Sequence, residues 1–148
     1  MEIICEVKYF YCWYEQMIHN FDFRIFYEDT DLAGIVYYAN YLKFIERGRS
    51  TLIRESGIDQ DLLRDLGYFF VVKKINAEYH ASAKLDDELR VETQLIKISG
   101  AKVEFNQCVY NKNLLLFSSI VTVAFITARG QPKRLPSDII DKLKQFAA

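Results

Sequence analysis

Apolar side chains recur at every second position from Phe21 through Phe23 and Ile25 to Tyr27. This period of two predicts a strand with one buried face. The acidic segment 28–31, Glu-Asp-Thr-Asp, follows directly and predicts the turn that ends the strand.

The period changes to that of a helix over residues 37–56. One face of this helix carries Tyr41, Ile45, Gly48 and Leu52, and the opposite face carries Lys43, Arg47, Ser50 and Arg54. Gly57 is a typical end for it. Because glycine lowers helix propensity, Gly48 on the apolar face predicts a close approach between the helix and the element it packs on.

Strand patterns fill most of the remaining chain. We predict a short helix over 60–66, strands over 68–79, 89–98, 103–109 and 114–126, and a short helix that starts at Pro136. The alternation changes phase near residues 95–96, which predicts a β-bulge. The segment 114–126 is apolar almost throughout, as is typical of a central strand covered on both faces.

One strand, one long helix and then four strands in a meander predict a single two-layer α+β domain, with a five-stranded antiparallel sheet wrapped around the helix. One helix cannot cover both sides of such a sheet. We therefore expect a second copy of the chain to cover the remainder, and predict a homo-oligomer, either a dimer or a tetramer.

Composition narrows the class of protein. A length of 148 residues fits one domain, and 51% hydrophobic with 26% charged residues excludes a disordered chain. A net charge of −1 argues against a protein that binds nucleic acid by neutralising phosphates. The three cysteines, Cys5, Cys12 and Cys108, match no metal-binding spacing and are expected to be free thiols.

The N-terminal segment 1–20 differs from the rest of the chain. It is rich in aromatic residues, and its glutamates interrupt the apolar run that a signal peptide needs. No other apolar run is long enough to span a bilayer, so we expect a cytoplasmic protein with no integral membrane segment. We divide the chain into an N-terminal extension, 1–20, and a domain, 21–148. Residues 1–16 are expected to be either a mis-assigned start or a disordered extension, which N-terminal mass spectrometry distinguishes.

The segment between the first strand and the long helix carries the chemistry. Asp31 and Gly34 stand directly before the predicted helix start near Tyr37. The first N–H groups of a helix have no intrahelical partner and carry the positive end of its dipole, so they can donate to a polarised carbonyl oxygen. A carboxylate beside them can attack an acyl carbon or activate water, as acyl-transfer hydrolysis requires. The sequence leaves open which of the two Asp31 does.

The residues alone also allow two other interpretations of this segment. In the first, Asp31 is an ordinary helix N-cap and Gly34 a turn residue, the commonest arrangement for an aspartate before a helix. In the second, Glu28, Asp29 and Asp31 hold a metal ion, which strand alternation and the lack of a neighbouring histidine disfavour. We expect no metal site.

The segment YEDTDLAGIVYYANYLKFIERGRSTLIRESG, residues 27–57, resembles the start of the hotdog-fold acyl-CoA thioesterases of the YbgC and 4-hydroxybenzoyl-CoA thioesterase family. The resemblance implies a hotdog domain and a hydrolase that needs no cofactor. It also implies that Asp31 is the catalytic carboxylate, that the Tyr38 amide donates to the thioester carbonyl, and that Gly34 forms a tight turn under the substrate. Further substrate-binding positions implied by the motif are Val36, Tyr37, Asn40 and Tyr41.

Other titratable groups are weaker candidates for the chemistry. Many members of the family have a histidine where this chain has Tyr38, and we expect His19 and His80 to be surface or structural histidines that do not replace it. Glu46 lies on the helix beside the apolar face, where pairing with a neighbouring arginine as a surface charge is the favoured role.

The phosphates of coenzyme A need cations. The candidates are Arg129, Lys133 and Arg134, with Lys97 and Lys102 around the turn at 98–102. The predicted function is hydrolysis of short-chain or aromatic acyl-CoA thioesters to the free acid and coenzyme A. The alternative is a non-catalytic hotdog module that binds acyl-CoA or acyl-carrier protein, while a dehydratase ranks last because the motif lacks histidine.

Overall fold

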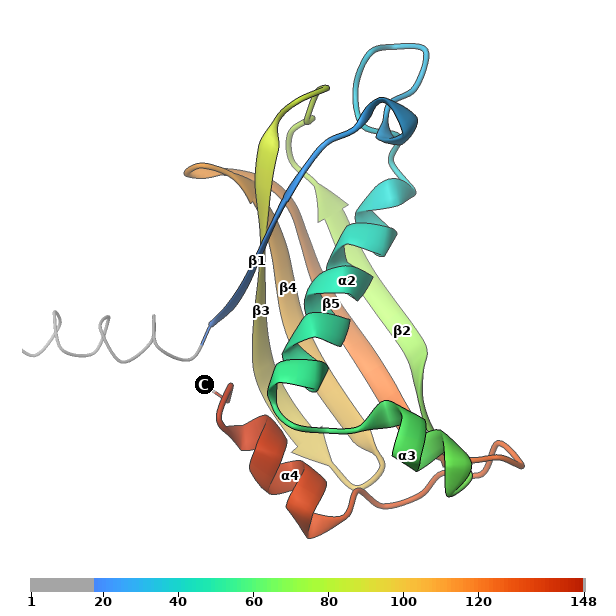
Figure 1. Ribbon diagram of the computed structural model, residues 1–148. Helices are drawn as coiled ribbons and strands as arrows, with labels where there is room; N and C mark the ends of the chain where they lie inside the picture. The colour runs from blue at the N-terminus through green and yellow to red at the C-terminus, as the bar shows by residue number, and fades with distance from the viewer. Residues whose placement is uncertain (1–17, 148) are drawn as a thin grey trace, which may run out of the picture.

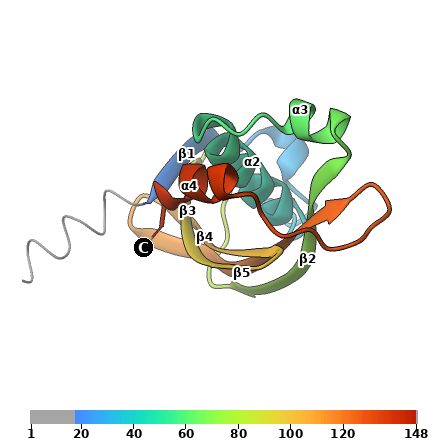
Figure 2. The same ribbon diagram turned by 90° about the horizontal axis from the view of Figure 1, so that it is seen from below.

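The computed structural model describes residues 18–147, which form a curved antiparallel sheet around one long helix (Figure 1). The strands are β1 (His19–Arg24), β2 (Tyr68–Tyr79), β3 (Glu88–Ser99), β4 (Lys102–Asn111) and β5 (Leu114–Thr127). The helices are α2 (Asn40–Glu55), α3 (Gln60–Asp65) and α4 (Ser137–Lys144), and a 3-10 turn, η1, covers Tyr27–Asp29. The view from below shows the sheet as an arc with α2 inside it (Figure 2). The predicted α+β architecture of one long helix and five antiparallel strands is therefore confirmed.

The apolar face of α2 packs on the concave side of the sheet. The largest fully buried side chains include Phe44, Ile45 and Leu52 of α2, Phe105 of β4, and Phe117 and Phe125 of β5. Gly48 lies so close to β3 that a Cβ atom added to it would be 2.7 Å from Cγ1 of Val91. The close approach predicted from Gly48 is confirmed, since a larger side chain would overlap β3.

The order of the strands corrects the predicted meander. The sheet order is β1-β3-β4-β5-β2, so β3, β4 and β5 form a meander while β2 pairs with β5. The connection between β2 and β3, residues 80–87, is too long for a tight hairpin. Its first residue, His80, donates to the carbonyl of Leu116, and Asp86 near its end donates to that of Ile25. The connection therefore runs from the edge strand β2 across one end of the sheet to β3, which lies between β1 and β4.

The first strand ends earlier than the alternation predicts. Tyr27 lies in η1 with 82% of its surface exposed, and β1 stops at Arg24. The carboxylate of Asp29 accepts a hydrogen bond from the backbone N–H of Phe26 at 2.9 Å, and such a local turn competes with strand pairing. At its other end β1 begins at His19, two residues inside the segment assigned to the N-terminal extension. The hypothesis about residues 1–16 concerns a segment outside the described residues.

Of two predictions about the strands, a bulge in β3 and the burial of both faces of β5, the structure agrees with the first only. The bulge expected near residues 95–96 is confirmed, because the register of β3 shifts between Leu95 and Lys97. Side chains along β5 alternate between buried and half-buried, and Ile120 on the outer face is 37% exposed. Within the described chain β5 is thus covered on one face only, so the predicted cover on both faces is not provided by this chain itself.

None of the helices in residues 18–147 has the length and apolar composition that crossing a bilayer requires.

Candidate active site

The loop 29–38 connects η1 to α2 and is tied together at its two ends. The backbone N–H of Tyr37 donates to the carbonyl oxygen of Asp29 at 2.9 Å, and Nδ2 of Asn40 donates to the same oxygen at 3.0 Å. Asn40 is buried, so its side-chain amide binds the loop from the interior of the protein. The loop is consequently held against the start of α2 by backbone geometry.

Asp31 begins a tight turn inside this loop. Its Oδ1 accepts a hydrogen bond of 2.8 Å from the N–H of Ala33, and its carbonyl accepts one of 3.0 Å from the N–H of Gly34. Gly34 has φ of +77°, a backbone conformation that favours glycine. Within residues 18–147 the second carboxylate oxygen, Oδ2, accepts no hydrogen bond, and the side chain is half-exposed.

The interpretation of Asp31 as a helix N-cap is wrong. The N-cap of α2 is Ala39, and no side chain caps this helix end. Asp31 lies eight residues before Ala39 in sequence, and its Oδ1 is used by the Asx turn described above.

Tyr38 stands two residues before the first residue of α2, whereas the sequence predicted that the helix starts near Tyr37. The helix is shorter because Tyr37, Tyr38 and Ala39 form a turn in which the N–H of Asn40 donates to the carbonyl of Tyr37 at 2.9 Å. That carbonyl and the N–H of Tyr38 belong to one planar peptide and point in opposite directions. In the part of the chain that the structure describes, no acceptor takes the N–H of Tyr38.

A cavity of about 280 Å³ lies beside this turn. It is lined by Ile35, Val36, Tyr38, Tyr41, Tyr79, His80 and the two residues that follow His80. Three of the residues singled out from the sequence, Val36, Tyr38 and Tyr41, are thus brought together. Tyr79 ends β2 and His80 follows it. Sequence periodicity could not assign them to the site, because it does not show which strand end meets the loop.

Three phenols in or next to the cavity lining, those of Tyr37, Tyr41 and Tyr79, have a raised pKa and stay protonated at neutral pH. The pKa of Tyr37 is raised by its side-chain hydrogen bond with Tyr38, and the charge of Asp31 contributes in the same direction. Burial raises the pKa of Tyr41 and of Tyr79. These groups can therefore donate hydrogen bonds.

The cations proposed for coenzyme A lie far from the Tyr38 turn within one chain. The segment 128–136, between β5 and α4, is the orange-red connection at the lower right of Figure 1, while the loop 29–38 is at the top. Arg129, Lys133 and Arg134 belong to this segment. The pairing of Tyr68 with Thr127, and of Tyr79 with Phe117, sets the two regions at opposite ends of β2.

Lys102 has a cationic neighbour on β2. The pKa of Lys73 is lowered by its side-chain contact with Lys102 and by the charge of that residue. Lys73 stands at the irregularity of β2 between Val72 and Lys74, which the apolar pattern of this strand did not predict.

The other titratable candidates have internal partners. Nε2 of His19 lies 2.7 Å from Oε2 of Glu55, and the His19 side chain is buried. Nε2 of His80 lies 2.8 Å from Oγ of Ser118. Glu46 is exposed and accepts a hydrogen bond from Ser50 instead of pairing with an arginine.

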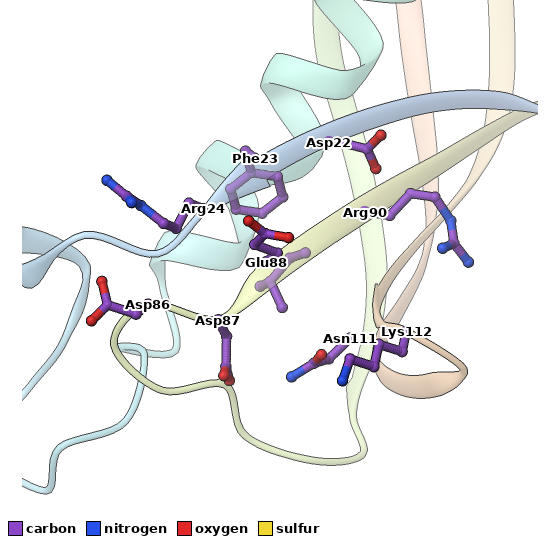
Figure 3. Close-up of a pocket in the computed structure, with 10 residues that line it drawn as sticks. Asp22, Phe23, Arg24, Asp86, Asp87, Glu88, Arg90, Asn111 and Lys112 are labelled. Atoms are coloured by element: carbon purple, nitrogen blue, oxygen red, sulfur yellow. The ribbon is translucent and has the colours of Figure 1, made fainter.

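A larger cavity of about 890 Å³ opens between β1, the start of β3 and the turn after β4 (Figure 3). Its lining carries the charged residues Asp22, Arg24, Asp86, Asp87, Glu88, Arg90 and Lys112. The carboxylates are spread around the opening and do not converge on one point (Figure 3). Across residues 18–147 no three histidine, cysteine or acidic side chains are grouped so as to hold a metal ion, and this cavity contains neither Asp31 nor Tyr38.

Comparisons with known proteins find matches to both the sequence and the fold of this chain. A model of the thioesterase-like superfamily matches residues 27–143. Acyl-CoA thioester hydrolase YbgC of Escherichia coli O157:H7 is 36% identical over 124 residues, covering 82% of this chain and 92% of that protein. Acyl-CoA thioesterase YbgC of Haemophilus influenzae is 38% identical over 122 residues, covering 81% and 90%. The crystal structure of a probable thioesterase from Bartonella henselae matches with a TM-score of 0.77 at 35% identity, covering 80% of this chain and 99% of the other. These matches confirm the resemblance inferred from the motif, and the chain belongs to the thioesterase-like superfamily.

Proposed function

We propose that this protein hydrolyses acyl-CoA thioesters to the free acid and coenzyme A. The observation that carries the proposal is the N–H of Tyr38, which no acceptor among the described residues takes and which belongs to a peptide held by Asn40. Asp31 in the same loop has a carboxylate oxygen that is likewise unused. The names of the Escherichia coli and Haemophilus influenzae relatives support the same reaction.

In this proposal the thioester carbonyl oxygen accepts the N–H of Tyr38, which stabilises the negative charge that develops on that oxygen in the transition state. Asp31 either attacks the carbonyl carbon or removes a proton from an attacking water. If Asp31 attacks, the carbon–sulfur bond breaks to leave an acyl–Asp31 anhydride, which water then hydrolyses to the carboxylic acid and free Asp31. If Asp31 activates water instead, the same bond breaks and the carboxylic acid forms directly. In both cases coenzyme A leaves as a thiolate, which takes up a proton to become the thiol. The proposed substrate contacts are Gly34, Val36, Tyr37 and Tyr41. Asn40 is buried and supports the loop 29–38 from inside the fold.

We also propose that the site is shared between two copies in a homo-oligomer. β2 is an edge strand of 12 residues, and its apolar residues Val71 and Val72 are 39% and 46% exposed. Antiparallel pairing of two β2 edges would place the Tyr68 end of one copy beside the Tyr79 end of the other. Arg129, Lys133 and Arg134 of a second copy would then lie near the Tyr38 turn, which one chain alone does not achieve.

The direct test is thiol release from a panel of short-chain and aromatic acyl-CoAs, with the corresponding acyl-carrier-protein thioesters alongside. Asp31→Asn should lower kcat by at least about 100-fold, because the amide is neither an effective nucleophile nor a base. Asp65→Asn, an exposed aspartate on α3, is the matched control and should retain wild-type kcat. Equal turnover by wild type and Asp31→Asn would contradict the role of Asp31.

The same panel distinguishes hydrolysis from the non-catalytic alternative. Saturable binding of acyl-CoA or acyl-carrier protein, with no thiol released from any substrate, would show a binding module and overturn the proposed hydrolysis.

A further inference from the structure

Tyr79 hydrogen-bonds the residue that carries the proposed oxyanion donor. Its hydroxyl donates to the carbonyl oxygen of Tyr38 at 2.9 Å. Tyr79 is the last residue of β2, 41 positions away in sequence, so the bond links the sheet to the turn before α2. Among residues 18–147, Tyr79 is the one residue whose side chain hydrogen-bonds the backbone of Tyr38.

The position of the Tyr79 ring is set by the core. Its centroid lies 5.1 Å from that of Phe117 and 5.7 Å from that of Tyr41. Phe117 is fully buried and Tyr41 is 2% exposed, so both neighbours are fixed by packing. The Tyr79 ring itself is 49% exposed and lines the 280 Å³ cavity, with its hydroxyl reaching from this scaffold to the loop.

The hydroxyl completes a set of restraints around Tyr38. On the N-terminal side, the N–H of Tyr37 is bound by Asp29 and the carbonyl of Tyr37 is bound by Asn40. On the C-terminal side, the carbonyl of Tyr38 is bound by Tyr79. With the peptides on both sides held, the φ and ψ angles of Tyr38 have little freedom, and the direction of its N–H is fixed.

We propose that Tyr79 is a positioning residue whose hydroxyl orients the Tyr38 amide toward the thioester oxygen. The inference rests on the proposed function, in which that amide stabilises the transition state. A donor acts strongly only when it is aligned with the developing charge before the reaction. Loss of the Tyr79 hydroxyl should therefore affect turnover more than binding of the ground-state substrate.

Burial raises the pKa of Tyr79, so its hydroxyl remains a donor throughout the neutral range. A positioning role consequently needs no change in the protonation of Tyr79 during the reaction.

The test is Tyr79→Phe, which keeps the ring and removes the hydroxyl. We expect kcat to fall about tenfold with KM within about twofold of wild type, because the lost interaction acts in the transition state. The shape of the pH dependence of kcat should stay that of wild type. Tyr110→Phe, a half-buried tyrosine on β4 outside the site, is the matched control and should keep wild-type kcat.

Two kinetic results would overturn the inference. An unchanged kcat in Tyr79→Phe would show that the hydroxyl does not position the amide. A raised KM with wild-type kcat would make Tyr79 a substrate contact instead.

Amide hydrogen exchange measured by NMR tests the positioning role of Tyr79 without depending on catalytic activity. The amides of Tyr37 and Asn40, whose hydrogen bonds flank Tyr38, should exchange faster in Tyr79→Phe than in wild type, with no change in Tyr110→Phe. If wild type releases no thiol from any substrate, the proposed function fails. Unchanged exchange in Tyr79→Phe would overturn the positioning role, whatever the result with substrates.

Discussion

The side-chain amide of Asn40 donates a 3.0 Å hydrogen bond to the carbonyl oxygen of Asp29, which joins the first residue of α2 to the start of the loop 29–38. The same carbonyl oxygen accepts the N–H of Tyr37 at 2.9 Å. One buried acceptor thus holds both ends of the loop that carries Asp31 and Gly34. The backbone N–H of Asn40 also binds the carbonyl of Tyr37, so this residue supports the loop with its side chain and its main chain.

Replacing Asn40 with alanine should loosen the loop. We expect Asn40→Ala to lower the free energy of unfolding by about 1–3 kcal/mol, since a buried hydrogen bond is lost. The value of kcat should fall as well, because the loop and the Tyr38 turn share the Asp29 carbonyl. Urea unfolding and thiol-release kinetics measure the two effects, with Asn113→Ala in the exposed turn before β5 as the control. Wild-type stability and kcat in Asn40→Ala would show that the loop does not depend on this bond.

The contact of Gly48 with Val91 predicts a steric penalty. An added Cβ would lie 2.7 Å from Cγ1 and 3.1 Å from Cβ of Val91. Overpacking of this kind costs about 1–3 kcal/mol, while replacing glycine in a helix returns up to about 1 kcal/mol. We therefore expect Gly48→Ala to be destabilising in urea unfolding. The penalty should be smaller when Gly48→Ala is introduced into a Val91→Ala background, and an equal penalty in both backgrounds would contradict the clash.

Sequence periodicity was sufficient to predict the layers of the fold. The apolar face around Gly48 gave the helix and its close approach to the sheet, and the change of phase near Leu95 located a bulge. Both are properties of neighbouring residues along one element. The partner of β2 was not predictable in this way, because it depends on the path of the connection 80–87 across the sheet.

The site, too, could be predicted only where it depends on neighbouring residues. The motif identified Asp31 and Tyr38, but the hydrophobic period extended α2 to Tyr37, whereas the turn bond between Asn40 and Tyr37 delays the helix start. The bond from Tyr79 to Tyr38 joins residues 41 positions apart, and no local pattern contains it. Local periods predict elements, while the site depends on how distant elements meet.

The buried pair of Arg49 and Gln107 predicts an asymmetric response to substitution. Nη1 of Arg49 donates to Oε1 of Gln107 at 2.9 Å, and both side chains are buried. Burial lowers the pKa of Arg49, which means that its charge is poorly solvated. Gln107→Leu should cost about 3–5 kcal/mol, because it takes a hydrogen-bond acceptor from the buried guanidinium and also removes the bonds that Nε2 of Gln107 donates to Ile45 and Thr93. Arg49→Met should cost less, about 1–3 kcal/mol, because it leaves only a neutral acceptor unpaired. The reverse order in urea unfolding would contradict this account.

Cys108 on β4 should be a slow nucleophile. It is half-buried, and burial raises the pKa of its thiol, with the charge of Glu92 acting in the same direction. Because the thiolate is the reactive form, a raised pKa lowers the reactive fraction at any pH below it. Alkylation by iodoacetamide should therefore be slower at pH 8 than for an unstructured peptide cysteine, with its pH midpoint displaced upward. The measurement uses a protein in which Cys5 and Cys12 are replaced by serine, so that only Cys108 reacts. Adding Glu92→Gln should move the midpoint back toward the ordinary thiol value, and a midpoint at or below that of the peptide would contradict the prediction.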